Sequence, residues 1–535
     1  MKKFKLIISI IAITGMMISC GNDYLTQYPS GDVVAGAPAT QDVIEQNLTG
    51  AYQILLFDCY ANGQWMPVNG YFDLCSDDVY KGGGDAGDQG DDLLVAEFRS
   101  DPVRVRTGWW SIFYAGLKRC NGAIEAIDNA VDVQDDKLAQ YRAQALTLRA
   151  YFVHWLWKAY GNIPYFDKAW TEEPFLAPQH SFDELYPRII ADLDAAINTP
   201  EFPMTAADYN LNNKTANRGR VTKAMAMMTK ARVVLYFKDQ SKYAQVLADM
   251  KTIITNGAFS LVTTAAQPNF TGTGGASTSN PFEWIFLRDG EFCSESIFEV
   301  NHYPEGKSWG GSWSGFGSYT PRFTGARALN HPIFVAGWGF CPVVPSAYAI
   351  FDAADYRRDA SVIEFPAGTS DIGYQHTGLW LKKYIARIGY NVGTRGDRDL
   401  NYENNKRIYR IAEAYLNAAE LEFYANGTGG AQQYLDAIRD RAFGNTVSRI
   451  PATLENIKLE RHREFFGEGM RFWDLVRWGT DENGKTITEV LSVNDPSVPV
   501  SRTWSNDKRF LPIPQSEIDR TKGTDYELKQ NPGYN

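Results

Sequence analysis

Histidine and cysteine, from which many metal and nucleophile sites are built, are scarce in this sequence. The 535 residues include 6 histidines and 6 cysteines. No two histidines stand at metal-ligand spacing, and neither an HExxH pattern nor a pair of CxxC motifs occurs. The cysteines after Cys20 are too few and too unpatterned for a disulfide framework or a zinc site, so we expect most of them to be buried thiols.

Runs of lysine and arginine are absent as well, and the formal net charge is −10. Because binding to nucleic-acid phosphates needs a basic face, the composition argues against a nucleic-acid partner. Hydrophobic residues make up 44% of the chain and charged residues 22%. These are the proportions of a globular protein, and they exclude a disordered chain, a collagen and a coiled coil.

A hydrophobic run long enough to cross a bilayer is also missing, because the apolar segment Leu6–Ile18 falls short of the roughly 20 residues that a spanning helix needs. This segment follows three early lysines and ends at Ser19-Cys20, which resembles a bacterial lipobox, where the cysteine is lipidated. We therefore predict a lipoprotein signal peptide over residues 1–19 and a lipid-anchored tether over residues 20–40. An ordinary secretory signal that ends in cysteine is the alternative.

Helical periodicity dominates two long regions, residues 41–257 and 407–535. The alanine-bearing helix pairs in them loosely resemble tetratricopeptide (TPR) repeats, in which small residues let paired helices approach closely. Residues 62–95, 258–406 and 510–535 are predicted to be loops or irregular. The predicted helices are Asp42–Phe57, Val105–Ala130, Asp136–Tyr160, Ser181–Asn198, Val221–Lys238, Ser241–Asn256, Arg407–Asn426, Gly430–Phe443 and the block Leu454–Trp478.

A tract rich in glycine and aspartate runs from Lys81 to Asp92. Its carboxylates and turn carbonyls would suit a hard cation such as calcium. Calcium repeats of that kind work in stacks, however, and only one unit is present here. A solvated loop is the better interpretation, so we expect no cofactor, and calcium binding is unsupported.

Several motifs, taken together, connect the chain to a known family. The motifs are Leu148–Tyr151, Tyr160–Tyr165, Arg410–Glu420, Glu460–Gly479, Leu511–Ile518 and Gln530–Tyr534. With them the chain resembles the SusD/RagB family of outer-membrane lipoproteins from Bacteroidetes, and the resemblance runs from Cys20 to the end of the sequence. It implies a mainly α fold, a TPR-like helical superhelix that carries an irregular, loop-rich ligand-binding insertion at residues 258–406.

The resemblance also implies a role without catalysis. Such proteins sit on the outside of the outer membrane, capture an oligosaccharide, and hand it to a SusC-like TonB-dependent transporter. We therefore expect a glycan ligand, a SusC-like partner and an outer-membrane location facing the cell exterior. RagB-like members imply a peptide ligand as an alternative. A glycoside hydrolase is less favoured, although 63 acidic residues leave room for a catalytic carboxylate pair.

The insertion holds many aromatic residues set among glycines. Glycine-rich loops cannot easily bury so many rings, and the flat faces of sugars stack on aromatic side chains, so we expect ligand contacts here. The alternative is that the rings anchor the loops to the helical frame. The candidates are Trp309, Trp313, Phe316, Tyr319 and Trp338, with a polar rim that includes Arg322, Arg327 and Asn330, and with Trp65 and Tyr80 added because family members also use an early loop.

Charged residues recur at three- and four-residue steps through the Leu459–Trp478 motif. Opposite charges at this spacing share a helix face and pair. One interpretation is a carboxylate pair for acid–base chemistry. The favoured interpretation is a charged network that locks helices together, and it extends to Arg410, Glu413 and Glu420.

Overall fold

The computed structural model describes residues 38–57, 68–169, 176–211, 216–264, 278–310, 315–496 and 498–534. The predicted signal peptide, Cys20, Cys59, Trp65 and Trp313 lie outside these residues. Within the described part, none of the helices combines the length and the apolar character needed to cross a bilayer.

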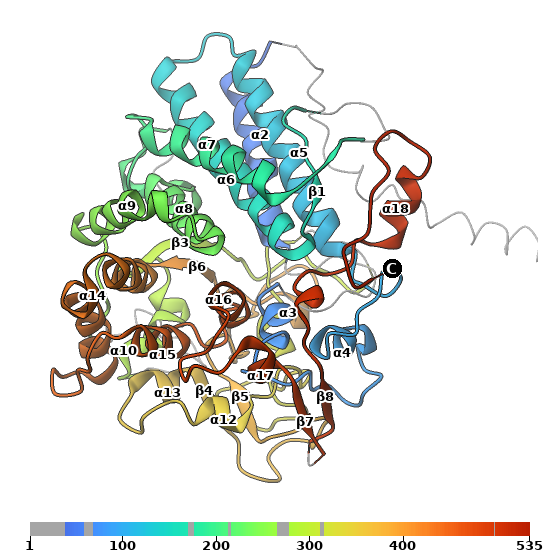
Figure 1. Ribbon diagram of the computed structural model, residues 1–535, viewed down its shortest axis with the longest axis vertical. Coiled ribbons are helices and arrows are strands. Elements are labelled where there is room, and N and C mark those ends of the chain that lie inside the picture. The colour runs from blue at the N-terminus through green and yellow to red at the C-terminus, as the bar shows by residue number, and fades with distance from the viewer. Residues whose placement is uncertain are drawn as a thin grey trace, which may run out of the picture.

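Long helices form a curved frame in which successive helices along the chain pack on each other, except that the last packs on an earlier helix of the frame. Figure 1 shows them following one another from α2 and α5 through α8 and α9 to α14. The prediction of a mainly α, TPR-like superhelix is therefore confirmed. The frame helices are α2 (Gln41–Gln53), α5 (Gly108–Asp128), α6 (Asp135–Tyr160), α7 (Phe182–Asn198), α8 (Lys223–Phe237), α9 (Tyr243–Thr255), α14 (Ile411–Phe443), α15 (Leu454–Glu464) and α16 (Arg471–Trp478).

Local sequence signals set several helix ends. Ser181 and Glu184 form a capping box at the start of α7, and α6 stops at Gly161, where φ is +68°. Gly427, with φ +67°, breaks α14 into two helices. The ring centroids of Tyr415 and Tyr434 lie 6.4 Å apart across this break, so the two halves of α14 pack on each other as the helix–turn–helix pair that the sequence predicts.

Two predictions about loops are wrong. Residues 62–95 contain α3 (Val68–Leu74) and all but the last residue of α4 (Gly90–Ala96), and the C-terminal tail contains α18 (Gln515–Thr521). The sequence of α3 shows no clear helical periodicity, and tertiary packing stabilises the helix instead. The ring centroid of Phe72 lies 5.2 Å from that of Trp109 and 4.5 Å from that of Trp473.

The predicted helical block Leu454–Trp478 is also interrupted. It divides into α15 and α16 because Gly467 and Gly469 both adopt positive φ between them. Glycine takes such angles readily, so the chain turns here and brings the two helices against different parts of the frame.

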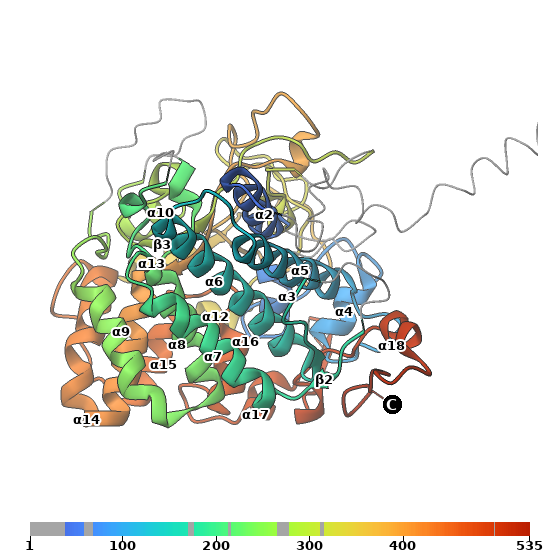
Figure 2. The ribbon, with the colours of Figure 1, turned by 90° about the horizontal axis from the view of Figure 1, so that it is seen from above.

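The insertion is irregular, as predicted, and Figure 2 shows much of it gathered along one edge of the molecule. It is joined to the frame by a two-stranded antiparallel sheet of β3 (Ser296–Val300) and β6 (Lys406–Arg410). Its elements are α10 (Pro281–Ile285), β3 (Ser296–Val300), α11 (Thr320–Phe323), α12 (Pro345–Tyr348), α13 (Tyr356–Ser361), β4 (Val362–Glu364) and β5 (Leu379–Leu381). The remaining elements are β1 (Ile163–Pro164), β2 (Gln179–His180), β6 (Lys406–Arg410), α17 (Ile487–Leu491), β7 (Val493–Asp495) and β8 (Val500–Arg502).

A fully buried ion network holds the insertion on the frame. The Glu464 carboxylate of α15 accepts hydrogen bonds from Arg410 at 2.7 Å, Arg441 at 2.6 Å and Arg357 at 3.3 Å. These arginines come from β6, α14 and α13 respectively. Burial acts to raise the pKa of Glu464, but the three guanidinium groups outweigh it and hold that pKa well below its usual range.

Ion pairs of the same kind connect the frame helices. Arg477 of α16 forms a bidentate pair with Glu420 of α14, at 2.6 and 2.7 Å, and Arg461 donates to Asp474 at 2.7 Å. The prediction that the charged motifs form a network between helices is therefore correct.

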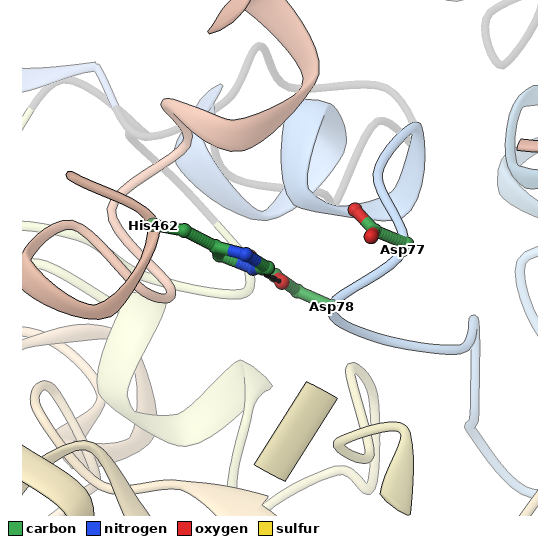
Figure 3. Close-up of side chains that lie close together, drawn as sticks. All are labelled: Asp77, Asp78 and His462. Carbon is green, nitrogen blue, oxygen red and sulfur yellow. Dashed lines mark hydrogen bonds and ion pairs between the residues drawn. The ribbon is translucent and has the colours of Figure 1, made fainter. Parts of the chain in front are cut away.

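His462 ties the early chain to the C-terminal block (Figure 3). Its Nε2 lies 2.7 Å from Asp78 and its Nδ1 lies 3.0 Å from Glu482. Burial and the Arg471 charge act to lower the pKa of His462, but the two carboxylates outweigh both and raise it to about 9. The imidazole is therefore a cation at neutral pH.

Neutralising Glu464 should destabilise the protein strongly. Glu464→Gln leaves three buried guanidinium groups without their shared anion, so we expect the free energy of unfolding to fall by about 3–5 kcal/mol. Urea unfolding followed by circular dichroism measures it. Asp440→Asn is the control, because it breaks only the exposed pair with Arg449 and should change stability by less than about 1 kcal/mol. Equal effects of the two substitutions would contradict a stabilising role for the network.

Stability should also depend on pH through His462. Its pKa is raised in the folded state, so its contribution is complete below the unfolded pKa of about 6.5 and is lost as pH rises through about 9. Across this window the free energy of unfolding should fall by up to about 3 kcal/mol more in the wild type than in His462→Gln. Parallel pH profiles of the two proteins, measured by urea unfolding, would refute this assignment.

Candidate functional site

Three aromatic rings of the insertion form a stack that runs from the core to the surface. Tyr319 is buried, with 1% of its surface exposed, and the partly buried Trp338 stacks on it at a centroid distance of 5.9 Å. Trp309 leans on Trp338 at 5.8 Å with 51° between the ring planes. Trp309 is 48% exposed, so the stack ends in an indole that is open to solvent. We call Trp309 and Trp338 the aromatic platform.

Backbone hydrogen bonds hold Trp338 in place. Its N–H donates to the Arg322 carbonyl at 2.8 Å, and the neighbouring Gly339 N–H donates to Gly325 at 2.8 Å. A side chain at Gly337 would come within 2.1 Å of the Gly325 carbonyl oxygen. The glycines therefore allow two chain segments to approach closely enough to fix the ring.

Trp309 is positioned by a second set of contacts. The backbone N–H of Trp309 donates to an Asp397 carboxylate oxygen at 2.8 Å. Two residues earlier, Lys307 exchanges hydrogen bonds with the Asn401 side chain at 3.0 and 2.8 Å. The loop that presents the indole is thus fastened to the end of the insertion, close to β6.

The other predicted ligand residues that the structure describes differ in exposure. Phe316 is 51% exposed, on a segment whose backbone pairs with Tyr303 and Glu305. Tyr80 is only 8% exposed and, like Tyr319, presents no open ring face, so neither supports the expectation of direct stacking. Both are held by the core: Tyr319 supports the platform, while the Tyr80 N–H donates to Pro342.

The glycine and aspartate tract borders the platform, a placement that sequence reasoning missed. Arg327 donates to the Trp338 carbonyl at 2.9 Å and to Asp88 at 3.2 Å. Gly82 and Gly83 are buried against the segment that follows Trp338, so the first part of the tract is packed rather than solvated. Asp88 also accepts the Gly84 N–H at 2.8 Å.

One group of residues in the described part, Asp77, Asp78 and His462, has donor atoms close enough together to hold a metal ion. A histidine ligand must offer an unprotonated nitrogen. Here each ring nitrogen faces a carboxylate, and Asp77 is held by a bidentate pair with Arg471 at 2.8 and 2.9 Å. In Figure 3 a dashed line joins His462 to Asp78 only. The group is an ion network and does not fit a metal.

Residues Gly306–Gly310 spell a GxSxG pattern, which sequence reasoning overlooked. In serine hydrolases this pattern forms a sharp turn between a strand and a helix. Ser308 lies instead in an irregular stretch, with neither a strand before it nor a helix after it in the described residues 301–310. The pattern therefore lacks the structural context of a nucleophile.

Family models match two parts of the chain. The model described as "SusD family" matches residues 351–534, and the model described as "Starch-binding associating with outer membrane" matches residues 96–287. Among curated proteins, "SusD-like protein P2" of Formosa agariphila is 26% identical over 472 residues, which cover 84% of this chain and 86% of that protein.

Solved structures give a stronger match. Surface glycan-binding protein A from Bacteroides fluxus is 46% identical, with a TM-score of 0.82, and the match covers 93% of this chain and all (100%) of that chain. Surface glycan-binding protein A from Bacteroides thetaiotaomicron, in complex with laminarihexaose, is 34% identical with a TM-score of 0.80, over 92% and 100% of the two chains. A laminarin-binding SusD-like protein is 27% identical with a TM-score of 0.75, over 93% and 100%.

The helical frame, the motif network and the matches over nearly the whole length all point the same way. This chain belongs to the SusD/RagB family.

Proposed function

We propose that this protein binds a glycan at the cell surface by stacking sugar rings on the aromatic platform. The observation that carries the proposal is the half-exposed Trp309 indole, fixed above Trp338 on a rigid base. Related proteins that bind laminarihexaose or laminarin support a laminarin-type glucan as the ligand.

The geometry suits a sugar. A pyranose ring offers a flat face of C–H groups to an indole, and its hydroxyl groups need hydrogen-bonding partners at the edge. Asp88 and Arg327 lie beside Trp338 and supply an acceptor and several donors. Stacking with a few hydrogen bonds corresponds to affinities of roughly 4–8 kcal/mol, in the micromolar to millimolar range, which permits release of the cargo.

A peptide ligand, the RagB-like alternative, is less well supported. Peptide capture by β-augmentation uses a free strand edge. The longest strand inside the insertion, β3, pairs with β6 on one side and is buried at four of its five residues, so little of its other edge is open to a peptide. The exposed surface nearby is aromatic. The solved relatives named for glycan binding favour the sugar.

The proposal does not include catalysis. A glycosidase needs one carboxylic acid with a raised pKa opposite a second carboxylate. Two described carboxylates beside the platform have partners: Asp397 accepts from the backbone N–H of Trp309, and Asp88 pairs with Arg327. Glu305 pairs with Arg395, whose hydrogen bond lowers the pKa of Glu305. Incubation with laminarin should leave its chain length unchanged.

We further propose that the protein is a lipoprotein of the outer membrane that delivers the glycan to a SusC-like TonB-dependent transporter. The lipobox-like sequence ending at Cys20 and the match to a family described as associating with the outer membrane support this part. Weak, reversible binding on an open platform is compatible with transfer to a partner.

Replacing Trp309 should weaken glycan binding without unfolding the protein. Trp309→Ala removes the exposed stacking face, so the Kd for laminarihexaose should rise at least tenfold, equivalent to about 1.4 kcal/mol. Trp309→Phe keeps a smaller ring, so its Kd should lie between those of the unsubstituted protein and Trp309→Ala. Isothermal titration calorimetry of the chain from residue 21 onward measures these values. An unchanged Kd with an unchanged number of bound molecules in a folded Trp309→Ala protein would overturn the proposal.

Replacing Cys20 should release the protein from the membrane. Cys20→Ala removes the thiol that carries the lipid, and the chain should move from the membrane fraction to the soluble fraction. Immunoblotting of the separated fractions reports this shift. Cys59→Ala is the matched control and should stay with the membrane; release of both variants, or of neither, would argue against lipidation at Cys20.

A further inference from the structure

A pocket of about 400 Å³ opens where the C-terminal tail meets β2, away from the aromatic platform. This volume lies within the range of about 300–1,000 Å³ that is typical of small-molecule sites. In Figures 1 and 2 the α18 end of the tail stands apart from the loops of the insertion. The lining includes Asn162, Gln179, Asp525, Tyr526, Glu527 and Lys529.

The walls of the pocket are fixed by hydrogen bonds between distant parts of the chain. The Gln179 side chain donates to the carbonyls of Asn162 at 2.8 Å and Lys529 at 3.0 Å, and it accepts the Lys529 N–H at 3.0 Å. Asn531 donates to the Tyr160 carbonyl at 2.8 Å. The pocket is therefore formed before any ligand arrives.

Tyr526 lines the pocket from a tight turn. Its N–H donates to the Thr524 hydroxyl at 3.3 Å, and the Gly523 N–H donates to Glu527 at 2.9 Å. Leu528, next but one along the chain, is buried and anchors the turn. Tyr526 as a whole is 42% exposed, and in the described part of the chain no aromatic ring stacks on it. A large ring held open on a pinned turn is a preorganised stacking surface.

The chemistry of the rim selects among ligands. Asp525 and Glu527 would repel an anionic ligand. A purely apolar ligand would leave the amides and charges around the ring without hydrogen-bonding partners. Acidic, basic and amide groups around one aromatic face match the alternating hydroxyl groups and flat C–H face of a neutral sugar.

We propose that this pocket is a second carbohydrate-binding site, in which a sugar ring stacks on Tyr526. The proposal rests on the proposed function for the identity of the ligand, but not on the platform. A long glucan that touches both sites on one molecule would be held more tightly than an oligosaccharide that reaches only one.

Calorimetric stoichiometry with laminarihexaose tests the second site on the chain from residue 21 onward. The unsubstituted chain should bind two molecules, whereas Tyr526→Ala and Trp309→Ala should each bind one. The double variant should bind none. On long laminarin, affinity electrophoresis should show each single variant retarded at least tenfold less than the unsubstituted chain. Tyr424→Ala, which removes a 45% exposed tyrosine from α14, is the matched control and should bind two molecules.

The outcomes separate the two proposals. If the unsubstituted chain binds one molecule, Trp309→Ala binds none and Tyr526→Ala still binds one, the second site is overturned and the platform is kept. If the unsubstituted chain binds one molecule and only Tyr526→Ala loses it, the platform is overturned and the pocket is kept. Absence of any binding to the unsubstituted chain overturns both.

Discussion

The buried Glu464 carboxylate is the point on which the arrangement of this protein depends. It is shared by arginines from β6, from the C-terminal part of α14, and from α13, which lies about fifty residues earlier in the insertion. A buried charge that loses its partners costs several kcal/mol, so these three elements cannot shift independently. Because Arg410 ends β6 and begins α14, and Arg357 belongs to the insertion, the network fixes the irregular part against the regular part. The helical frame can then support loops that have little secondary structure of their own.

The aromatic stack extends that rigidity to the surface. Tyr319 is fully buried, Trp338 is partly covered, and Trp309 is half exposed, so each ring rests on a more deeply held one. A stacking surface of this kind loses little conformational entropy when a ligand binds. Binding by a fixed surface needs no reactive group, which agrees with carboxylates that are engaged in ion pairs and backbone contacts around the platform.

Much of this could be predicted from the sequence because the signals are local. Periodicity, the Ser181 capping box and the breaks at Gly161 and Gly427 identify most frame helices, and charges at helical spacing identify the ion network, although these signals miss the break between α15 and α16. Helix α3 could not be predicted, since the rings that pack around Phe72 come from distant segments. For the same reason the sequence identified the aromatic-rich region but could not separate the open Trp309 from the buried Tyr80, or place Asp88 beside Trp338.

The most direct test of the account is a crystal structure of the chain from residue 21 onward, grown with laminarihexaose. We expect a glucose ring to lie flat on the exposed face of Trp309, with carbon atoms about 3.5–4.0 Å from the indole, and hydroxyl groups directed at Asp88 or Arg327. A hexasaccharide bound to the protein while the Trp309 face stays bare would contradict the claim that this platform is the glycan site.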